Sequence, residues 1–168
     1  MTKRLATMCF VAMSVIGLTS PSVRAQDSEF TRATLKDISA VNVLVEELSD
    51  GAKTLGLTTD AIQTDVELKL RLAGIRVVTL EEALKVPGGP ILYVLVSVLP
   101  DGRAASIEIE LHQNVLLERN GLRVVGMPTW NTRYLMWEPN PTAQAVRNVV
   151  KDQVDVFLNA WLAVNPKK

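Results

Sequence analysis

The sequence is poor in the residues that most often carry chemistry. Its 168 residues include one cysteine, Cys9, and one histidine, His112. Cys9 lies in an apolar stretch near the N-terminus, so the rest of the chain has no thiol chemistry and no disulfide bond of its own. A Ser-His-Asp site would have to use His112, and the G-x-S-x-G motif that presents a catalytic serine is absent. We therefore expect that the protein is not an enzyme.

The sequence also lacks an excess of charge of one sign. It has 18 basic and 18 acidic residues. Three of the basic residues and none of the acidic ones lie in the first 25 positions, so residues 26–168 carry 15 basic and 18 acidic residues and a net charge of −3. A surplus of lysine and arginine is typical of nucleic-acid binding and of attraction to anionic membranes. The composition therefore predicts neither partner.

The one long apolar run lies at the N-terminus. Lys3 and Arg4 precede residues 5–18, which are apolar apart from one threonine, one serine and one glycine, and Val23 and Ala25 follow. This order is typical of a secretory signal peptide cleaved after Ala25. A retained membrane anchor is the alternative, but these 14 residues are too few to span a bilayer comfortably.

A lipid anchor is a further alternative for the same segment. Cys9 follows Ala6-Thr7-Met8 inside the apolar run, and neither its place nor its neighbours suit lipid attachment. No later segment is long and apolar enough to span a membrane. We predict a signal peptide over 1–25 and a single domain over 26–168 with a loose N-terminal tail to about residue 36. The expected location is periplasmic or secreted.

The stretch D-V-E-L-K-L-R-L, residues 65–72, supports two interpretations. Its strict alternation of polar and apolar residues is typical of a half-exposed strand, including a strand of an outer-membrane barrel. The flanks favour a helix, because Thr58 is a good N-cap and Gly74 suits the position after a helix end. Seven of the eight residues are not β-branched, and most are strong helix formers. We therefore predict a helix over about 58–73.

The remaining pattern predicts five strands and a second long helix. The strands are expected over 41–48, 75–80, 91–99, 103–118 and 122–137, and the helix after Asn140-Pro141. The third strand is apolar on both faces and should be central. The last three strands follow one another through short turns, which predicts antiparallel pairing. The predicted fold is α+β, a mostly antiparallel sheet of four to five strands with two helices packed on one face.

The sharpest candidate for chemistry is E-I-E-L-H, which contains Glu108, Glu110 and His112. Residues two apart on a strand share a face and lie about 6–7 Å apart. Carboxylates and imidazole are ligands for zinc or manganese. The alternative is an ordinary solvated strand face, since three ligands along one straight strand converge poorly on one ion. We favour the solvated face and expect no cofactor.

The stretch T-W-N-T-R-Y-L-M-W, residues 129–137, concentrates large side chains. Aromatic residues and arginine are enriched at binding hot spots, so Trp130, Arg133, Tyr134 and Trp137 are the predicted partner-binding residues. The alternative is that the two tryptophans pack under the last helix against Phe157 and Trp161. Strand alternation must turn some of these groups outward in either case.

Three segments of the chain match a pattern found in other proteins: L-T-T-D-A-I-Q-T-D-V-E-L-K-L-R-L-A-G-I-R-V, I-L-Y-V-L-V-S-V-L and the closing W-L-A-V-N-P. With them, most of the mature chain resembles a group of small secreted bacterial proteins to which no activity is assigned. In element order alone, the chain is similar to envelope domains such as the TolB amino-terminal domain and the lipopolysaccharide-assembly lipoprotein of the outer membrane. Those proteins act as adaptors or assembly partners. Several are lipoproteins, whereas this chain lacks a cysteine at the required place.

The expected function is therefore binding. The first hypothesis is a periplasmic or secreted adaptor domain that contacts another envelope protein, either through the aromatic stretch or by accepting a strand at an open sheet edge. The second is a metal or small-ligand binding protein or enzyme that uses Glu108, Glu110 and His112. Self-association is a third possibility for the partner.

Overall fold

The computed structural model describes residues 27–166, so the predicted signal peptide and its cleavage after Ala25 lie outside the described residues. The described chain forms five strands and five helices. In order they are α1 (Glu29–Ala33), β1 (Ala40–Val45), α2 (Asp50–Thr54), α3 (Thr59–Ala73), β2 (Arg76–Val77), α4 (Leu80–Ala83), β3 (Ile91–Val98), β4 (Ala104–Leu117), β5 (Leu122–Trp137) and α5 (Ala143–Val164).

The strands form one sheet in the order β2-β1-β3-β4-β5. β3, β4 and β5 pair antiparallel through short connections, as the sequence predicts, and β3 is central. β1 pairs parallel with both of its neighbours, so the sheet is mixed. From the sequence, only the segment with the first predicted helix is long enough for a parallel crossover. The chain makes two crossovers, through α3 between β1 and β2 and through the short α4 between β2 and β3.

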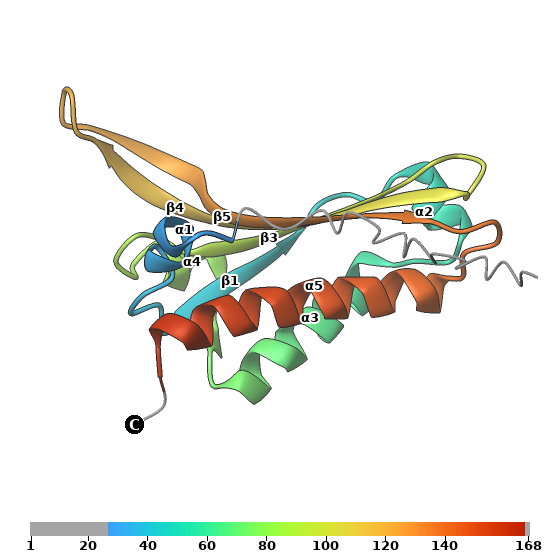
Figure 1. Ribbon diagram of the computed structural model, residues 1–168, viewed down its shortest axis with the longest axis horizontal. Helices are drawn as coiled ribbons and strands as arrows, with labels where there is room; N and C mark the ends of the chain where they lie inside the picture. Colours follow the sequence, from blue (N-terminus) through green and yellow to red (C-terminus); the bar gives the residue numbers. More distant parts are fainter. Residues whose placement is uncertain (1–26, 167–168) are drawn as a thin grey trace, which may run out of the picture.

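Two long helices cover one face of the sheet (Figure 1). The buried side of α5 is the apolar stripe expected from its sequence, with Val146, Val150, Val154 and Phe157 fully buried. The helix begins after the N-cap Thr142 rather than at Asn140. α4 lies on the opposite face, where Asn42 of β1 donates from Nδ2 to the Val78 carbonyl at 3.0 Å. The expected pair of helices is present, and α1, α2 and α4 are additional.

The alternating stretch 65–72 is part of helix α3. Thr58 is the N-cap and accepts a hydrogen bond from the Ala61 amide, while Gly74 ends the helix with φ 97°. That left-handed conformation costs glycine little and other residues much more. Ile62, Val66 and Leu70 recur every fourth residue and are fully buried. The apparent strand pattern is therefore the overlap of a buried helical stripe with polar and apolar residues on the other side.

The long strands β4 and β5 continue past the helical layer as a two-stranded arm (Figure 1). The arm, residues 113–126, begins where the register between the strands shifts, close to Pro128. From the sequence, Pro128 predicts a break in the strand over 122–137, whereas β5 is continuous and carries an irregularity. Strand alternation over 103–118 predicts that Val115 and Leu117 face the core, but they lie on the arm and are only partly buried.

The segment expected to be a loose tail to about residue 36 is folded from residue 29. α1 opens with a capping box formed by Ser28 and Thr31. Leu35 behind it is fully buried, and the Asn165 side chain donates to its carbonyl at 2.9 Å. The segment is polar in composition except for the buried Leu35, and the hydrogen bond from the end of α5 fixes the chain at this residue.

An ion pair joins the two long helices. The Arg147 guanidinium on α5 donates to both carboxylate oxygens of Asp65 on α3, at 2.8 and 2.9 Å. Hydrogen bonding to Arg147 holds the pKa of Asp65 below its ordinary value of 3.8, although desolvation opposes the shift. A carboxyl whose pKa is lower in the folded state stabilises the fold above the unfolded pKa and loses that contribution as the pH falls through the folded pKa.

We therefore expect Asp65→Asn to lower the free energy of unfolding by about 1 kcal/mol at pH 7. The difference from the wild type should shrink as the pH falls below 3.8, the ordinary pKa of the group, because protonation then removes the same charge. Urea unfolding at neutral and acidic pH measures both values. Arg147→Ala should show the same pH dependence, since it removes the same pair. A difference that stays constant with pH would contradict the assignment.

Candidate functional site

The face of the sheet away from α3 and α5 carries five of the seven candidate residues, all except Trp130 and Tyr134. We call it the open face. Its side chains follow from strand alternation and the register of β3, β4 and β5. They are Tyr93, Leu95, Ser97, Ser106, Glu108, Glu110, His112, Asn131, Arg133, Leu135 and Trp137.

Glu108 is paired with Arg133 across the strands. The two residues are register partners, and the Arg133 Nη2 atom lies 2.5 and 2.7 Å from the two carboxylate oxygens. Hydrogen bonding to Glu108, and then its charge, raises the pKa of Arg133 above its usual value. The carboxylate side chain is mostly buried, with 12% of its surface exposed. Glu108 is thus engaged by a cation on the next strand.

Glu110 and His112 form a second pair on the same face. Their Oε2 and Nε2 atoms are 2.7 Å apart, and the ring of Tyr93 stacks on the imidazole with centroids 5.1 Å apart. All three predicted ligands therefore share a face, as expected, but each already has a polar partner: Arg133 binds Glu108, and Glu110 and His112 bind each other. Within residues 27–166, no group of three histidine, cysteine or acidic residues is arranged to hold a metal ion.

The four predicted partner-binding residues lie on two faces of β5. Trp130 is 1% exposed and packs edge-to-face against Phe157 of α5, with ring centroids 5.3 Å apart. Tyr134 is on the same side as Trp130 and is partly exposed near the sheet edge. Arg133 and Trp137 belong to the open face. The four residues are therefore not one patch, because alternation separates Trp130 and Tyr134 from the other two.

The end of the open face near the β3–β4 turn is apolar. Trp137 is 73% exposed, Leu135 is 68% exposed and Leu99 is half exposed. A cavity of about 200 Å³ lies among Ser97, Val98, Leu99, Ala104, Ala105, Ser106 and Leu135. We call Leu99, Leu135 and Trp137 with this cavity the apolar end. Leu99 and Leu135 are not among the binding residues predicted from the sequence. Their positions in the strand alternation would have placed both on the open face.

The apolar end lies at an edge of the sheet. β5 pairs with β4 on one side, and no strand among residues 27–166 pairs with its other side. α1 approaches only the earlier part of β5, where the Thr34 hydroxyl lies 3.4 Å from the Thr129 carbonyl. The outward main-chain groups after residue 130 are therefore available to another strand.

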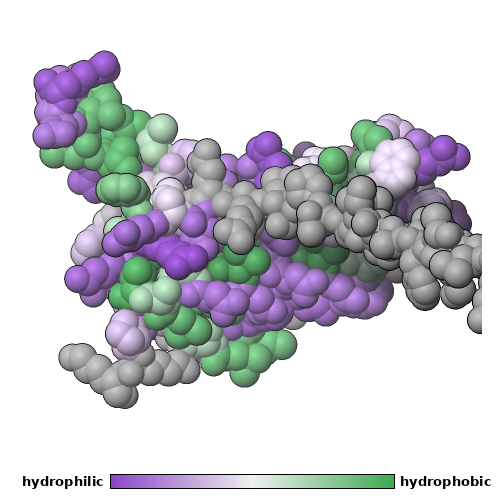
Figure 2. Space-filling view, in the orientation of Figure 1, coloured by the Kyte–Doolittle hydropathy of each residue, from purple (hydrophilic) through white to green (hydrophobic). Residues whose placement is uncertain are grey.

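The arm adds a second group of exposed apolar side chains. Figure 2 shows them along the arm behind a hydrophilic tip. The large ones are Leu116, Leu122 and Val125, and the exposed Met127 follows directly after the arm. A two-stranded hairpin is marginally stable in water by itself. Covering these side chains with another surface would therefore stabilise the arm.

Among the described residues, no helix has the length and apolar character needed to cross a bilayer.

Comparison with known proteins places the chain near two kinds of solved structure. No family model and no curated protein matches it. It is similar to a PelC dodecamer from Paraburkholderia phytofirmans, with 14% identity over 74% of this chain and 87% of that chain and a TM-score of 0.42. A minor lipoprotein from Acinetobacter baumannii gives 13% identity over 77% of this chain and 95% of that one, with a TM-score of 0.39. These comparisons do not confirm the expected likeness to the TolB amino-terminal domain or to the lipopolysaccharide-assembly lipoprotein.

Proposed function

We propose that the protein is a binding domain of the bacterial envelope whose partner is another protein. The observation that carries this proposal is the apolar end, where Trp137 and Leu135 are exposed beside an apolar cavity at an unpaired sheet edge. Exposed tryptophan in such a setting is typical of interface hot spots. The envelope location rests on the predicted signal peptide and on the resemblance to secreted bacterial proteins.

A strand of the partner can bind along β5. Its main chain would pair with the outward groups of β5, and its apolar side chains would contact Trp137 and enter the cavity beside Leu135. Arg133 lies two residues from Leu135 on the same face, and its pairing with Glu108 fixes the position of its guanidinium. This function needs positioning and burial of apolar surface and requires no catalytic group.

We expect a photo-crosslinking amino acid at position 135 to capture one envelope protein in intact cells. The same amino acid at position 159 should capture none, because Asn159 is exposed on the opposite side of the molecule, on α5. Adding Trp137→Ala to the variant labelled at position 135 should reduce capture at least about tenfold, which is the loss expected for a hot-spot tryptophan. The crosslinked bands are measured by immunoblot and identified by mass spectrometry.

Two results would contradict the proposal. Equal capture from positions 135 and 159 would show that contact is unspecific. Undiminished capture after Trp137→Ala would remove the apolar end from the interface. Capture of a second copy of this chain would instead identify self-association as the function of the edge.

A further inference from the structure

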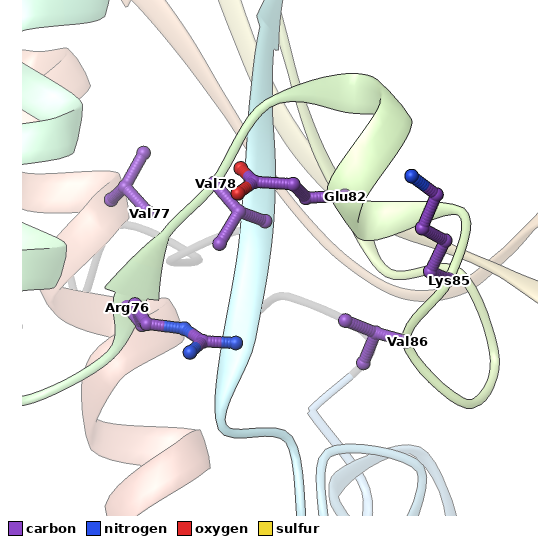
Figure 3. Close-up of a pocket in the computed structure, with 6 residues that line it drawn as sticks. All are labelled: Arg76, Val77, Val78, Glu82, Lys85 and Val86. Carbon is purple, nitrogen blue, oxygen red and sulfur yellow. The ribbon is translucent and has the colours of Figure 1, made fainter.

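A second cavity lies at the other end of the sheet, beside β2. It has a volume of about 450 Å³ and is lined by Arg76, Val77, Val78, Glu82, Lys85 and Val86. Figure 3 shows the Arg76 side chain extending from β2 toward the α4 side, the Val86 side chain pointing toward it, and the Glu82 carboxylate lying beside Val78. The volume falls within the range of about 300–1,000 Å³ typical of small-ligand sites.

The cavity holds opposite charges that do not satisfy each other. Among residues 27–166, the Arg76 guanidinium has no ion-pair partner, and neither does the Glu82 carboxylate. The charge of Arg76 nevertheless contributes to lowering the pKa of Glu82, after the larger effect of hydrogen bonds from Thr79. The two groups are thus near enough to interact and too far apart to pair.

Arg76 and Glu82 are each held on a different element of the fold. The Thr79 amide and hydroxyl both bind Oε2 of Glu82, at 2.9 and 3.0 Å, in the capping box that opens α4. Oε1 is left without a hydrogen bond from the described residues. Arg76 is anchored on β2, where its amide donates to the Ser39 carbonyl at 3.1 Å.

We propose that this cavity binds a small zwitterion, an α-amino acid with an apolar side chain. Arg76 binds the ligand carboxylate through its planar fork of donors, and Oε1 of Glu82 accepts from the ligand ammonium group. The side chain lies against the valines at 77, 78 and 86.

The test uses three probes on the mature protein, followed by NMR shifts of the Val78 and Val86 amides. L-leucine carries both charges, N-acetyl-leucine lacks the ammonium group and leucinamide lacks the carboxylate. We expect saturable shifts with L-leucine and an affinity at least tenfold lower for each of the other two. Equal binding of all three probes, or no saturable shift with L-leucine, would overturn the proposal.

Matched variants separate the charges from the fold. Glu82→Gln removes the negative charge and keeps the capping box, which accepts either residue. Arg76→Gln removes the positive charge at an exposed position of β2. Each should weaken L-leucine binding at least tenfold, whereas Glu81→Gln on the same helix should not. Retained binding in the first two variants would also overturn the proposal. None of these changes touches the apolar end, so partner capture there is a separate result.

Discussion

Replacing Trp130 with alanine is expected to lower the free energy of unfolding by about 3–5 kcal/mol, the cost of removing a large buried aromatic side chain. Trp130 is the largest fully buried side chain and packs edge-to-face against Phe157. Phe157 belongs to the buried stripe of α5, so the truncation removes a main contact between that helix and the sheet. Urea unfolding of a protein that spans residues 26–168, followed by circular dichroism, measures the loss.

Trp137→Ala is the matched control. The two tryptophans lie seven positions apart on the same strand, but Trp137 is 73% exposed, so its truncation should change stability by no more than about 0.5 kcal/mol. The two variants distinguish a core role for Trp130 from a surface role for Trp137, which the sequence alone could not assign. Similar losses in both variants would contradict the assignment of Trp130 to the core and Trp137 to the surface.

The sequence predicts the local elements of this fold well. The helix over 58–73 is α3, and its end signals Thr58 and Gly74 act as expected. The strands 91–99 and 103–118 lie within one residue of β3 and β4. These successes share a physical basis, because caps, turns and the period of apolar residues act over a few neighbouring positions.

The order of strands depends on distant contacts and could not be predicted in the same way. β2 has two residues, and four-residue α4 replaces the end of the strand expected over 75–80. Thr79 and Glu82 form a capping box there, a signal that the sequence does carry. When this capping box is taken into account, the predicted strand is shorter and a second crossover connection, between β2 and β3, becomes possible. The parallel pairing of β1 with both β2 and β3 follows from that crossover.

The candidate site divides along the same line. Strand alternation alone places Glu108, Glu110 and His112 on one face, and the structure agrees. The partners of these residues come from other strands, Arg133 from β5 and Tyr93 from β3. These contacts between strands can therefore be predicted only once the strand register is known. The cavity beside β2 is a different case, because its lining residues all lie within positions 76–86 and depend on the turn from β2 into α4.

Helix propensity alone predicts the wrong sign for the effect of Gly51→Ala on stability. The residue lies in α2, and replacing glycine with alanine inside a helix ordinarily stabilises it by about 1 kcal/mol. A Cβ atom at position 51 would lie 2.4 Å from the Leu99 carbonyl oxygen and 2.5 Å from that of Val98. Both atoms are main chain, so neither can move aside without moving the end of β3. We expect Gly51→Ala to destabilise the protein by at least about 2 kcal/mol.

Lys53→Ala on the same helix is the control and should leave the free energy of unfolding close to that of the wild type, because the side chain and its partner Glu47 are largely exposed. The Ser49 hydroxyl explains why the contact is so close. It lies 3.1 Å from the Val98 carbonyl oxygen and accepts from the Val98 amide at 2.9 Å, which fixes α2 against the end of β3. Leu99 follows directly and belongs to the apolar end, so Gly51→Ala should also weaken crosslinking from position 135. A stable variant with unchanged crosslinking would show that α2 does not hold this end of the sheet.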